Sequence, residues 1–376
     1  MIYLDYAANH PVDPAVLQRF CSVEQTFPGN PNSRHEAGRT ASGEMQKITA
    51  LIAEMLDVDP ASIIYTSGAT EANNLAVKGL ARTTRHCGRH IISTAIEHPS
   101  VSASLTWLQE QGYEIDLLPL RTDGTVDLEE LEYLLRKDTV LVTIPAVDSE
   151  LGTVQPIRQI RELIQNFPNC HLHVDATQAV GRIPFDFSLA DTVSLAPHKF
   201  GGLNGCGILV KRTDLVLEPI LHGGGSTTIY RSGTPALALA ASLETAMRLA
   251  LEEQDSRVSH VLELSAKLKK ALSAYPLVRI NSPAGAVPHI LNLSVEGIRG
   301  AEMQRQLDRK GICVSVKSAC SVEGTPSRAV FAVSKNRNTA RNSWRISLSH
   351  LTTEQEIDAF LKQFDLLYHE LTGDNK

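Results

Sequence analysis

Polar groups follow three short apolar runs of the chain, at places that a parallel sheet would bring together. The run "HLHVDA" reaches Asp175, with Gln178 shortly after it, and the run "TVSLA" is followed by His198 and Lys199. The run "SIIYTS" passes through Ser-Gly-Ala-Thr (67–70) directly into a predicted helix. Ligands of open α/β sheets bind at the carboxyl ends of the strands, so we expect these groups to line one pocket.

This set of groups fits the cofactor pyridoxal phosphate. Lys199 would hold its aldehyde as a Schiff base, Asp175 would keep its pyridine nitrogen protonated, and the helix start at 69–70 would bind its phosphate. The glycines in "KFGGLNGCG" would leave room for the cofactor beside the lysine. Taken alone, His198 and Lys199 would more simply be a solvated strand end, but the carboxylate and the helix start favour the cofactor.

Two other kinds of site are disfavoured in the same segments. The stretch "GGLNGCG" precedes a strand instead of opening a helix, which is the wrong order for a dinucleotide-binding loop. His171 and His173 alternate along one strand with no third ligand nearby in sequence, so no metal site is predicted.

The pattern of elements predicts an α/β fold. From about residue 45 to 210, short β-rich runs alternate with amphipathic helical stretches, which indicates a mostly parallel sheet of seven strands covered on both faces. The predicted strands are 62–67, 90–94, 114–120, 139–145, 171–176, 192–196 and 207–211. Predicted helices lie at 71–81, 100–111, 127–136 and 156–166.

The pattern changes after a long helix predicted near 234–273. Further runs and helices indicate a smaller α+β domain; they lie at 289–295, 300–310, 312–316, 343–348 and 353–371. We therefore predict a large domain over 1–255 and a small C-terminal domain over 256–376. Residues 1–20 are expected to pack with the small domain.

Composition excludes several classes of protein. The 376 residues carry a net charge of −6 with no basic block, so no direct contact with nucleic acid is expected. The N-terminal stretch does not have the pattern of a secretory signal, and no apolar stretch approaches the length of a membrane span. The six cysteines form no CxxC pair, which predicts a reducing cytoplasm and no disulfide framework.

Over nearly its whole length the chain resembles the cysteine desulfurases of the NifS/IscS type, which are class V aminotransferase-like, fold-type I pyridoxal-phosphate enzymes. Short motifs such as "SGAT" are weak one by one, but ten occur here in the family's order. They are "YLDYAANHPVDP", "GNPNSRH", "TSGATEANNLAVKG", "EHPSV", "HVDATQAVGRIP", "HKFGG", "HGGG", "RSGTP", "SACS" and "WRISLSHLTTEQEID".

The resemblance implies roles around the cofactor ring. Lys199 would form the internal aldimine and later move the Cα proton. His98 would stack on the ring and serve in proton transfer. Asp175 would pair with the pyridine nitrogen, and Gln178 with the phenolic oxygen.

It also implies how the phosphate and the substrate are held. Ala69, Thr70 and His198 would bind the phosphate. Thr234 would reach the phosphate of a neighbouring subunit, so the active unit would be a homodimer. Arg345 would bind the carboxylate of the substrate L-cysteine, for which its planar fork is suited.

Cys320, in "SACS", matches the nucleophile of the family. Its thiolate would attack the sulfur of the cysteine–cofactor adduct, leaving a persulfide on Cys320 and releasing alanine. The surrounding "KSACSVEGTPSR" has the composition of an exposed loop that can carry sulfur to an acceptor protein, such as an iron–sulfur scaffold or a thio-modification enzyme. Lys317 would favour the thiolate if it lies close.

Three departures from the family's pattern affect this interpretation. Ser149 stands where an asparagine would contact the phenolic oxygen and the substrate carboxylate. Ala196 and Pro197 replace serine and glycine before the lysine, which removes a hydroxyl and a backbone N–H from the phosphate site. Val316 and Lys317 stand where serine and glycine are usual.

Three functions therefore remain in competition. The favoured one is a cysteine desulfurase that passes sulfur from Cys320 to an acceptor. The second is another pyridoxal-phosphate enzyme on the same scaffold, such as a selenocysteine or cystine lyase or a transaminase, and Cys320 argues against most of these. The third is a degenerate homologue without catalysis that acts as a dimeric interaction protein.

Overall fold

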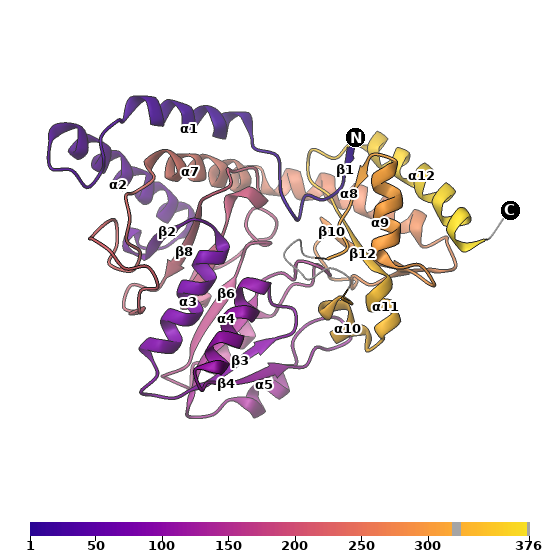
Figure 1. Ribbon diagram of the computed structural model, residues 1–376, viewed down its shortest axis with the longest axis horizontal. Helices are drawn as coiled ribbons and strands as arrows, with labels where there is room; N and C mark the ends of the chain where they lie inside the picture. Colours follow the sequence, from indigo (N-terminus) through magenta and orange to yellow (C-terminus); the bar gives the residue numbers. More distant parts are fainter. Residues whose placement is uncertain (318–324, 374–376) are drawn as a thin grey trace.

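A seven-stranded sheet forms the centre of the larger part of the molecule in the computed structural model, which describes residues 1–317 and 325–373 (Figure 1). The strand order is β2-β8-β7-β6-β5-β3-β4. All seven strands overlap predicted ones, so the predicted α/β fold class is confirmed. The strands are β2 (Ile63–Thr66), β3 (His90–Thr94), β4 (Glu114–Leu118), β5 (Thr139–Pro145), β6 (His171–Asp175), β7 (Thr192–Leu195) and β8 (Gly207–Lys211).

One strand of this sheet runs against the others. β8 is antiparallel to both of its neighbours, β2 and β7, whereas β7, β6, β5, β3 and β4 pair in parallel. Because two reversals cancel, β2 runs in the same direction as β7. The carboxyl ends of six strands therefore meet at one edge of the sheet, where the predicted site residues follow them.

Helices cover both faces of the sheet, as the near-continuous apolar strands predict. Neighbouring strand residues point to opposite faces: Ile91 packs in the cluster that contains α3 and α4, and Ile92 in the cluster that contains α2, α6 and α7. The helices of this part are α1 (Pro14–Thr26), α2 (Glu36–Leu56), α3 (Ala69–Thr83), α4 (Pro99–Glu110), α5 (Leu128–Leu134), α6 (Ile157–Ile164) and α7 (Leu237–Glu252).

A second hydrophobic core lies beside the first and includes the start of the chain. The antiparallel sheet β12-β10-β9 and the parallel pair β1-β11 contribute to it. In the described ranges 1–317 and 325–373, no helix has the length and hydropathy to cross a membrane. The strands are β1 (Ile2–Tyr3), β9 (Val278–Ile280), β10 (Ile290–Val295), β11 (Ile312–Cys313) and β12 (Ser343–Ser347), and the helices are α8 (Gln254–Leu272), α9 (Gly300–Arg309) and α12 (Glu354–Thr372). Two short helices between them, α10 (Arg328–Ser334) and α11 (Arg337–Asn342), bury Ala329, Val330 and Ala340 in the first core instead.

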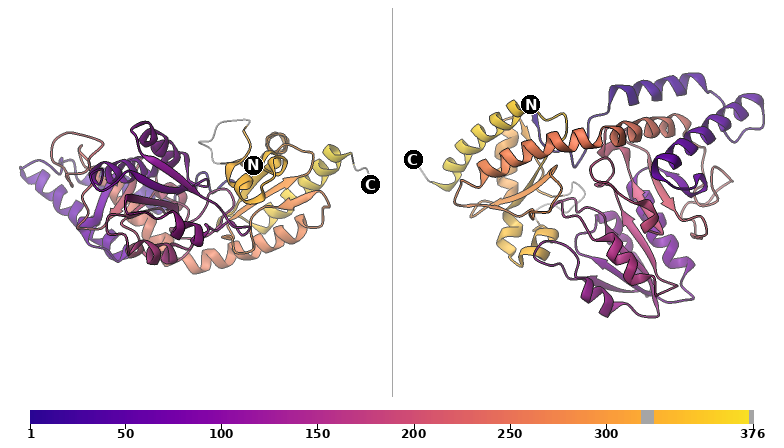
Figure 2. Two further views of the ribbon diagram at one scale, coloured as in Figure 1. Left: turned by 90° about the horizontal axis from the view of Figure 1, so that it is seen from below. Right: turned by 180° about the vertical axis from the view of Figure 1, so that it is seen from behind.

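The two cores are joined by consecutive helices. The continuous helix predicted over 234–273 is wrong: α7 ends at Glu252 and α8 begins at Gln254, with Glu253 outside helical geometry at φ −101° and ψ 6°. α7 packs in the first core and α8 in the second, and Figure 2 shows α8 extending away from the end of α7. Of residues 1–20, Ile2 and Leu4 pack with the second core, whereas α1 packs against α7.

Candidate active site

A cavity of about 360 Å³ lies at the edge of the sheet where the six strands end. This volume is within the ~300–1,000 Å³ typical of small-molecule sites. The structure brings nine of the predicted site residues together in its lining: Ala69, Thr70, His98, Ser149, Asp175, Gln178, His198, Lys199 and Arg345.

Lys199 follows β7 in a short 3₁₀ turn, and its amine points into this cavity. Nζ donates to the backbone carbonyls of Ala7, at 2.9 Å, and of Ala8, at 2.6 Å. Burial lowers the pKa of Lys199 to about 8, and nearby Arg345 and Arg182 act in the same direction. An amine with this pKa is partly neutral near pH 8, which is the form that attacks an aldehyde.

The turn that carries Lys199 begins with Pro197, one of the departures from the family's pattern. Proline suits the first position of a helical turn, because the N–H that it lacks has no partner there. Its carbonyl accepts from the N–H groups of Phe200 and Gly202 at 2.9 and 2.8 Å. A Cβ on Gly202 would lie 2.3 Å from the Pro197 Cβ, so glycine is required for this tight turn.

Asp175, at the end of β6, is held by a buried polar network. Its two oxygens accept from Asn73 Nδ2 at 2.8 Å and from the Thr177 N–H at 2.9 Å. Asn73 Oδ1 in turn accepts from His173 Nε2 at 3.0 Å, and burial lowers the pKa of His173 to about 4, so this imidazole is neutral. Within the described part of the chain Asp175 has no ion-pair partner, which leaves its charge available for a protonated ring nitrogen of a ligand.

His98 caps the start of α4 and is connected to the same network. Its Nδ1 accepts from the Ser100 N–H at 3.2 Å and lies 2.8 Å from Ser100 Oγ, which also accepts from Asn73 Nδ2 at 2.9 Å. Since Nδ1 is an acceptor, the neutral imidazole carries its proton on Nε2. Sequence reasoning missed Asn73 and Ser100; the signal for Asn73 was its place one helical turn after Thr70.

The start of α3 lines the cavity with backbone groups suited to an anion. Gly68 stands before the helix at φ +153° without a side-chain cap, so the first N–H groups of the helix remain available to an anion. The backbone at Gly68 packs closely against Gly207. Only glycine fits at position 207, because a Cβ there would lie 2.7 Å from the Gly68 Cα. Buried amine, buried carboxylate and helix start thus surround one cavity, and these residues fit pyridoxal phosphate.

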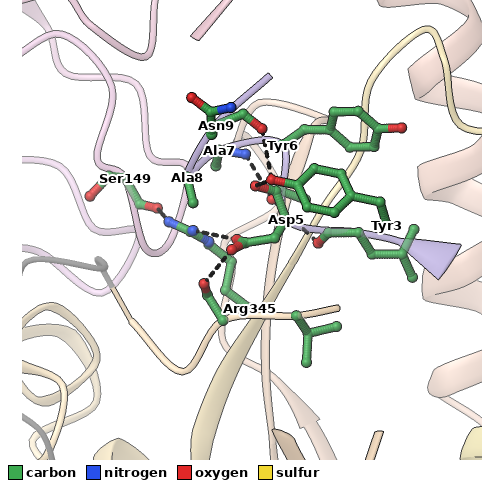
Figure 3. Close-up of polar contacts among 12 residues, drawn as sticks. Tyr3, Asp5, Tyr6, Ala7, Ala8, Asn9, Ser149 and Arg345 are labelled. Carbon is green, nitrogen blue, oxygen red and sulfur yellow. Dashed lines mark hydrogen bonds and ion pairs between the residues drawn. The ribbon is translucent and has the colours of Figure 1, made fainter. Parts of the chain in front are cut away.

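Arg345, on β12, is almost fully buried, at 1% exposure, and is fixed from two sides (Figure 3). Its Nη2 donates to Asp5 Oδ1 at 2.9 Å, and Asp5 Oδ2 accepts from Ser315 Oγ at 2.8 Å. Its Nη1 donates to the backbone carbonyl of Ser149 at 2.6 Å. Because this contact uses the backbone, the change from asparagine to Ser149 does not remove it. Sequence reasoning missed Asp5, although it belongs to the motif "YLDYAANH".

We expect Asp5→Asn to destabilise the protein, because it leaves a buried guanidinium without its carboxylate. The loss should be roughly 1.5–3 kcal/mol of unfolding free energy, the usual contribution of a hydrogen bond to a charged group. Urea denaturation measures it. Glu263→Gln, at an exposed site on α8, is the control and should change stability by less than ~0.5 kcal/mol. Equal stability of the two variants would show that the Asp5–Arg345 pair contributes nothing.

One predicted residue of the described chain, Thr234, does not line the cavity. Thr234 lies in a separate depression with Phe27 and Pro235. Cys320 falls outside the described residues 1–317 and 325–373. Lys317 donates to the Thr325 carbonyl at 2.9 Å. In the part of the chain that the structure describes, no three His, Cys, Asp or Glu side chains converge as metal ligands.

An α/β fold with its buried lysine and aspartate facing a helix start across one cavity defines the class: a pyridoxal-phosphate-dependent enzyme. The chain belongs to the aminotransferase class-V family, which matches residues 2–360, and within it to the NifS/IscS cysteine desulfurase group. The predicted family, fold and cofactor are confirmed.

The similarity to individual relatives extends over whole chains. A NifS/IcsS protein homolog of Lactobacillus delbrueckii subsp. bulgaricus is 36% identical, covering 100% of this chain and 99% of the relative. Cysteine desulfurase IscS of Proteus mirabilis is 38% identical over 96% of this chain and 91% of its own length. A solved NifS-like protein superposes with a TM-score of 0.92 at 34% identity, covering 97% of this chain and 98% of the other.

Proposed function

We propose that the protein is a cysteine desulfurase that converts L-cysteine to L-alanine and transfers the sulfur to a thiol of its own, that of Cys320. In the sulfur-transfer step, the Cys320 thiolate attacks the substrate sulfur, and the bond between that sulfur and the substrate Cβ breaks. The substrate Cβ keeps the electrons of this bond and takes a proton, so that the product is alanine. Cys320 keeps the sulfur as a persulfide. An acceptor protein, an iron–sulfur scaffold or a thio-modification enzyme, then removes it.

Each residue of the cavity has a task in this reaction. Bound pyridoxal phosphate supplies an electron sink for the electrons released at the substrate Cα. Arg345 binds the substrate carboxylate, Lys199 takes and returns the Cα proton, and His98 donates and accepts protons at Nε2. Asp175 keeps the cofactor's ring nitrogen protonated.

The observation that carries the proposal is the convergence of Lys199, Asp175, His98 and Arg345 on one cavity in a chain whose relatives include an IscS cysteine desulfurase. Replacement of serine and glycine by Ala196 and Pro197 weighs against tight phosphate binding, but the turn places Lys199 in the cavity. We propose further that the enzyme works as a cytoplasmic homodimer, with Thr234 completing the phosphate site of the partner subunit.

We expect the purified holoenzyme, given L-cysteine and a thiol reductant, to form alanine and sulfide in equal amounts. Amino-acid analysis and a sulfide assay measure the two products. A 2-oxo acid in place of alanine would identify a transaminase instead. Absence of any product, with no visible absorbance after addition of pyridoxal phosphate, would favour the non-catalytic homologue.

A further inference from the structure

A second cavity, of about 50 Å³, is lined by Lys199 and Phe200 and by residues of both hydrophobic cores. Of the lining residues, Phe200 belongs to the first core, and Val261 and Leu348 belong to the second. Every titratable residue in the lining of this cavity is basic, so we call it the basic cavity. These residues are His10, Arg182, Lys199, Arg257, His289 and His350.

Arg182 is half-buried in the lining of this cavity and has no anionic partner among the described residues. Its guanidinium donates to Gln178 Oε1 and to the carbonyl of Lys199, at 2.7 Å, which are both neutral acceptors. No carboxylate of the described residues lies within ion-pair distance of it. Burial lowers its pKa to about 9. An isolated buried cation is unfavourable unless a counter-charge accompanies it.

The histidines of the basic cavity are neutral, because burial lowers the pKa of each, and one of them has a ring nitrogen without a partner in the described ranges. His289 is 5% exposed, and its Nε2 has no hydrogen-bond partner in the described part of the chain. His10 and His350 stack with ring centroids 5.3 Å apart, and His10 Nδ1 lies 2.8 Å from the Pro11 carbonyl. Since a carbonyl only accepts, the Pro11 contact fixes the proton of His10 on Nδ1, and burial lowers the pKa of His10 to about 4, so this imidazole is neutral.

The size and chemistry of the basic cavity select the ligand. A volume of about 50 Å³ admits a small ion but no cofactor or nucleotide, since one water needs ~10–15 Å³ on this measure. Two guanidiniums favour an oxyanion, which they can bind through several N–H groups, and they repel a metal cation. Arg257 has one carboxylate partner, Glu253 at 3.1 Å, but Glu253 does not line the cavity.

We propose that the basic cavity binds one small inorganic oxyanion, of the type of sulfate or phosphate. The anion bridges Arg182, which follows first-core residue Val180, to Arg257 of α8 in the second core, and it also contacts His289. It therefore stabilises the contact between the two cores. The anion also offsets the charge of Arg182, whose guanidinium contacts the backbone carbonyl of Lys199. The anion itself lies outside the cavity of about 360 Å³ that we assign to the cofactor, here called the cofactor cavity.

Thermal unfolding of the holoenzyme in sodium sulfate tests this, with ionic strength held constant by sodium gluconate, whose anion is too large for the cavity. We expect the melting temperature to rise with sulfate along a one-site binding curve, and isothermal titration calorimetry to show one sulfate per chain. Arg257→Gln and His289→Leu should weaken sulfate binding by about tenfold or more. Arg248→Gln, at an arginine of α7 outside the cavity, should leave it unchanged.

Other outcomes overturn the proposal. A rise in melting temperature that does not saturate and is equal in all variants is the general effect of sulfate on protein surfaces. Calorimetry without binding heat, or Arg257→Gln binding sulfate as the parent does, is equally incompatible with a site. If His289→Leu does not fold, Arg257→Gln and the calorimetry of the parent protein still decide.

Discussion

We expect Lys199→Ala to remove the visible absorbance of the purified protein and to abolish alanine formation. Lys199 is the lysine whose amine lines the cofactor cavity, and its pKa of about 8 makes it a nucleophile for an aldehyde near neutral pH. Its loss takes away both the covalent link to the cofactor and the base for the Cα proton. The turnover rate should fall on the order of 10³-fold or more. Absorbance spectra and alanine release measure the two effects.

Lys211→Ala is the matched control. Lys211 is also buried, but its amine donates to the carbonyls of Arg212 and Thr213, away from the cofactor cavity. This variant should keep the visible absorbance. Reduction with borohydride followed by peptide mass spectrometry should find the cofactor on Lys199 of the parent protein. Cofactor on another lysine, or full absorbance of Lys199→Ala, would contradict the assignment.

Cys320→Ser should keep the visible absorbance and form no persulfide. The hydroxyl that replaces the thiol cannot accept sulfur, so alanine release should drop by about 10³-fold or more while the cofactor stays bound. Labelling of the persulfide after addition of L-cysteine, together with alanine release, measures the effect. This variant tests the sulfur transfer separately from the cofactor site.

The remaining cysteines provide the comparison for Cys320. Cys21→Ser, at an exposed cysteine on α1, should form as much persulfide as the parent protein. Cys170 and Cys206 are buried, and burial raises the pKa of each to about 12, so neither is a thiolate at neutral pH. Release of sulfide by Cys320→Ser at the parental rate would exclude the persulfide mechanism.

The sequence predicted the sheet and its edge well because their determinants are local. Each strand is a short apolar run, and a parallel arrangement alone brings the residues after β6 and β7 to one edge. Residue type and position therefore predicted that Asp175 and Lys199 would lie together, and both line the cavity at this edge. The break between α7 and α8 was not found, because Glu253 is neither glycine nor proline and tertiary packing decides its conformation.

Contacts between distant parts of the chain could not be predicted. The pairing of Asp5 with Arg345 joins residues 340 positions apart, and no periodicity reports such a contact. The sequence pointed to the Ser149 side chain, whereas the contact with Arg345 is made by its backbone carbonyl. The basic cavity could not be predicted for the same reason, because Arg182 and His289 are far apart in the sequence and meet only in the folded protein.

The N-terminal segment has a consequence for synthesis on the ribosome. Ile2 and Tyr3 pair with β11, Asp5 binds Arg345, and the carbonyls of Ala7 and Ala8 bind the amine of Lys199. Ile2, Tyr3 and Asp5 are thus translated first, but their partners at 312–313 and 345 are translated near the end of the chain. The strands of the large sheet can assemble during translation, but the catalytic centre is completed only after the chain is nearly finished. A nascent chain arrested before β12 would be a folded sheet without a working enzyme.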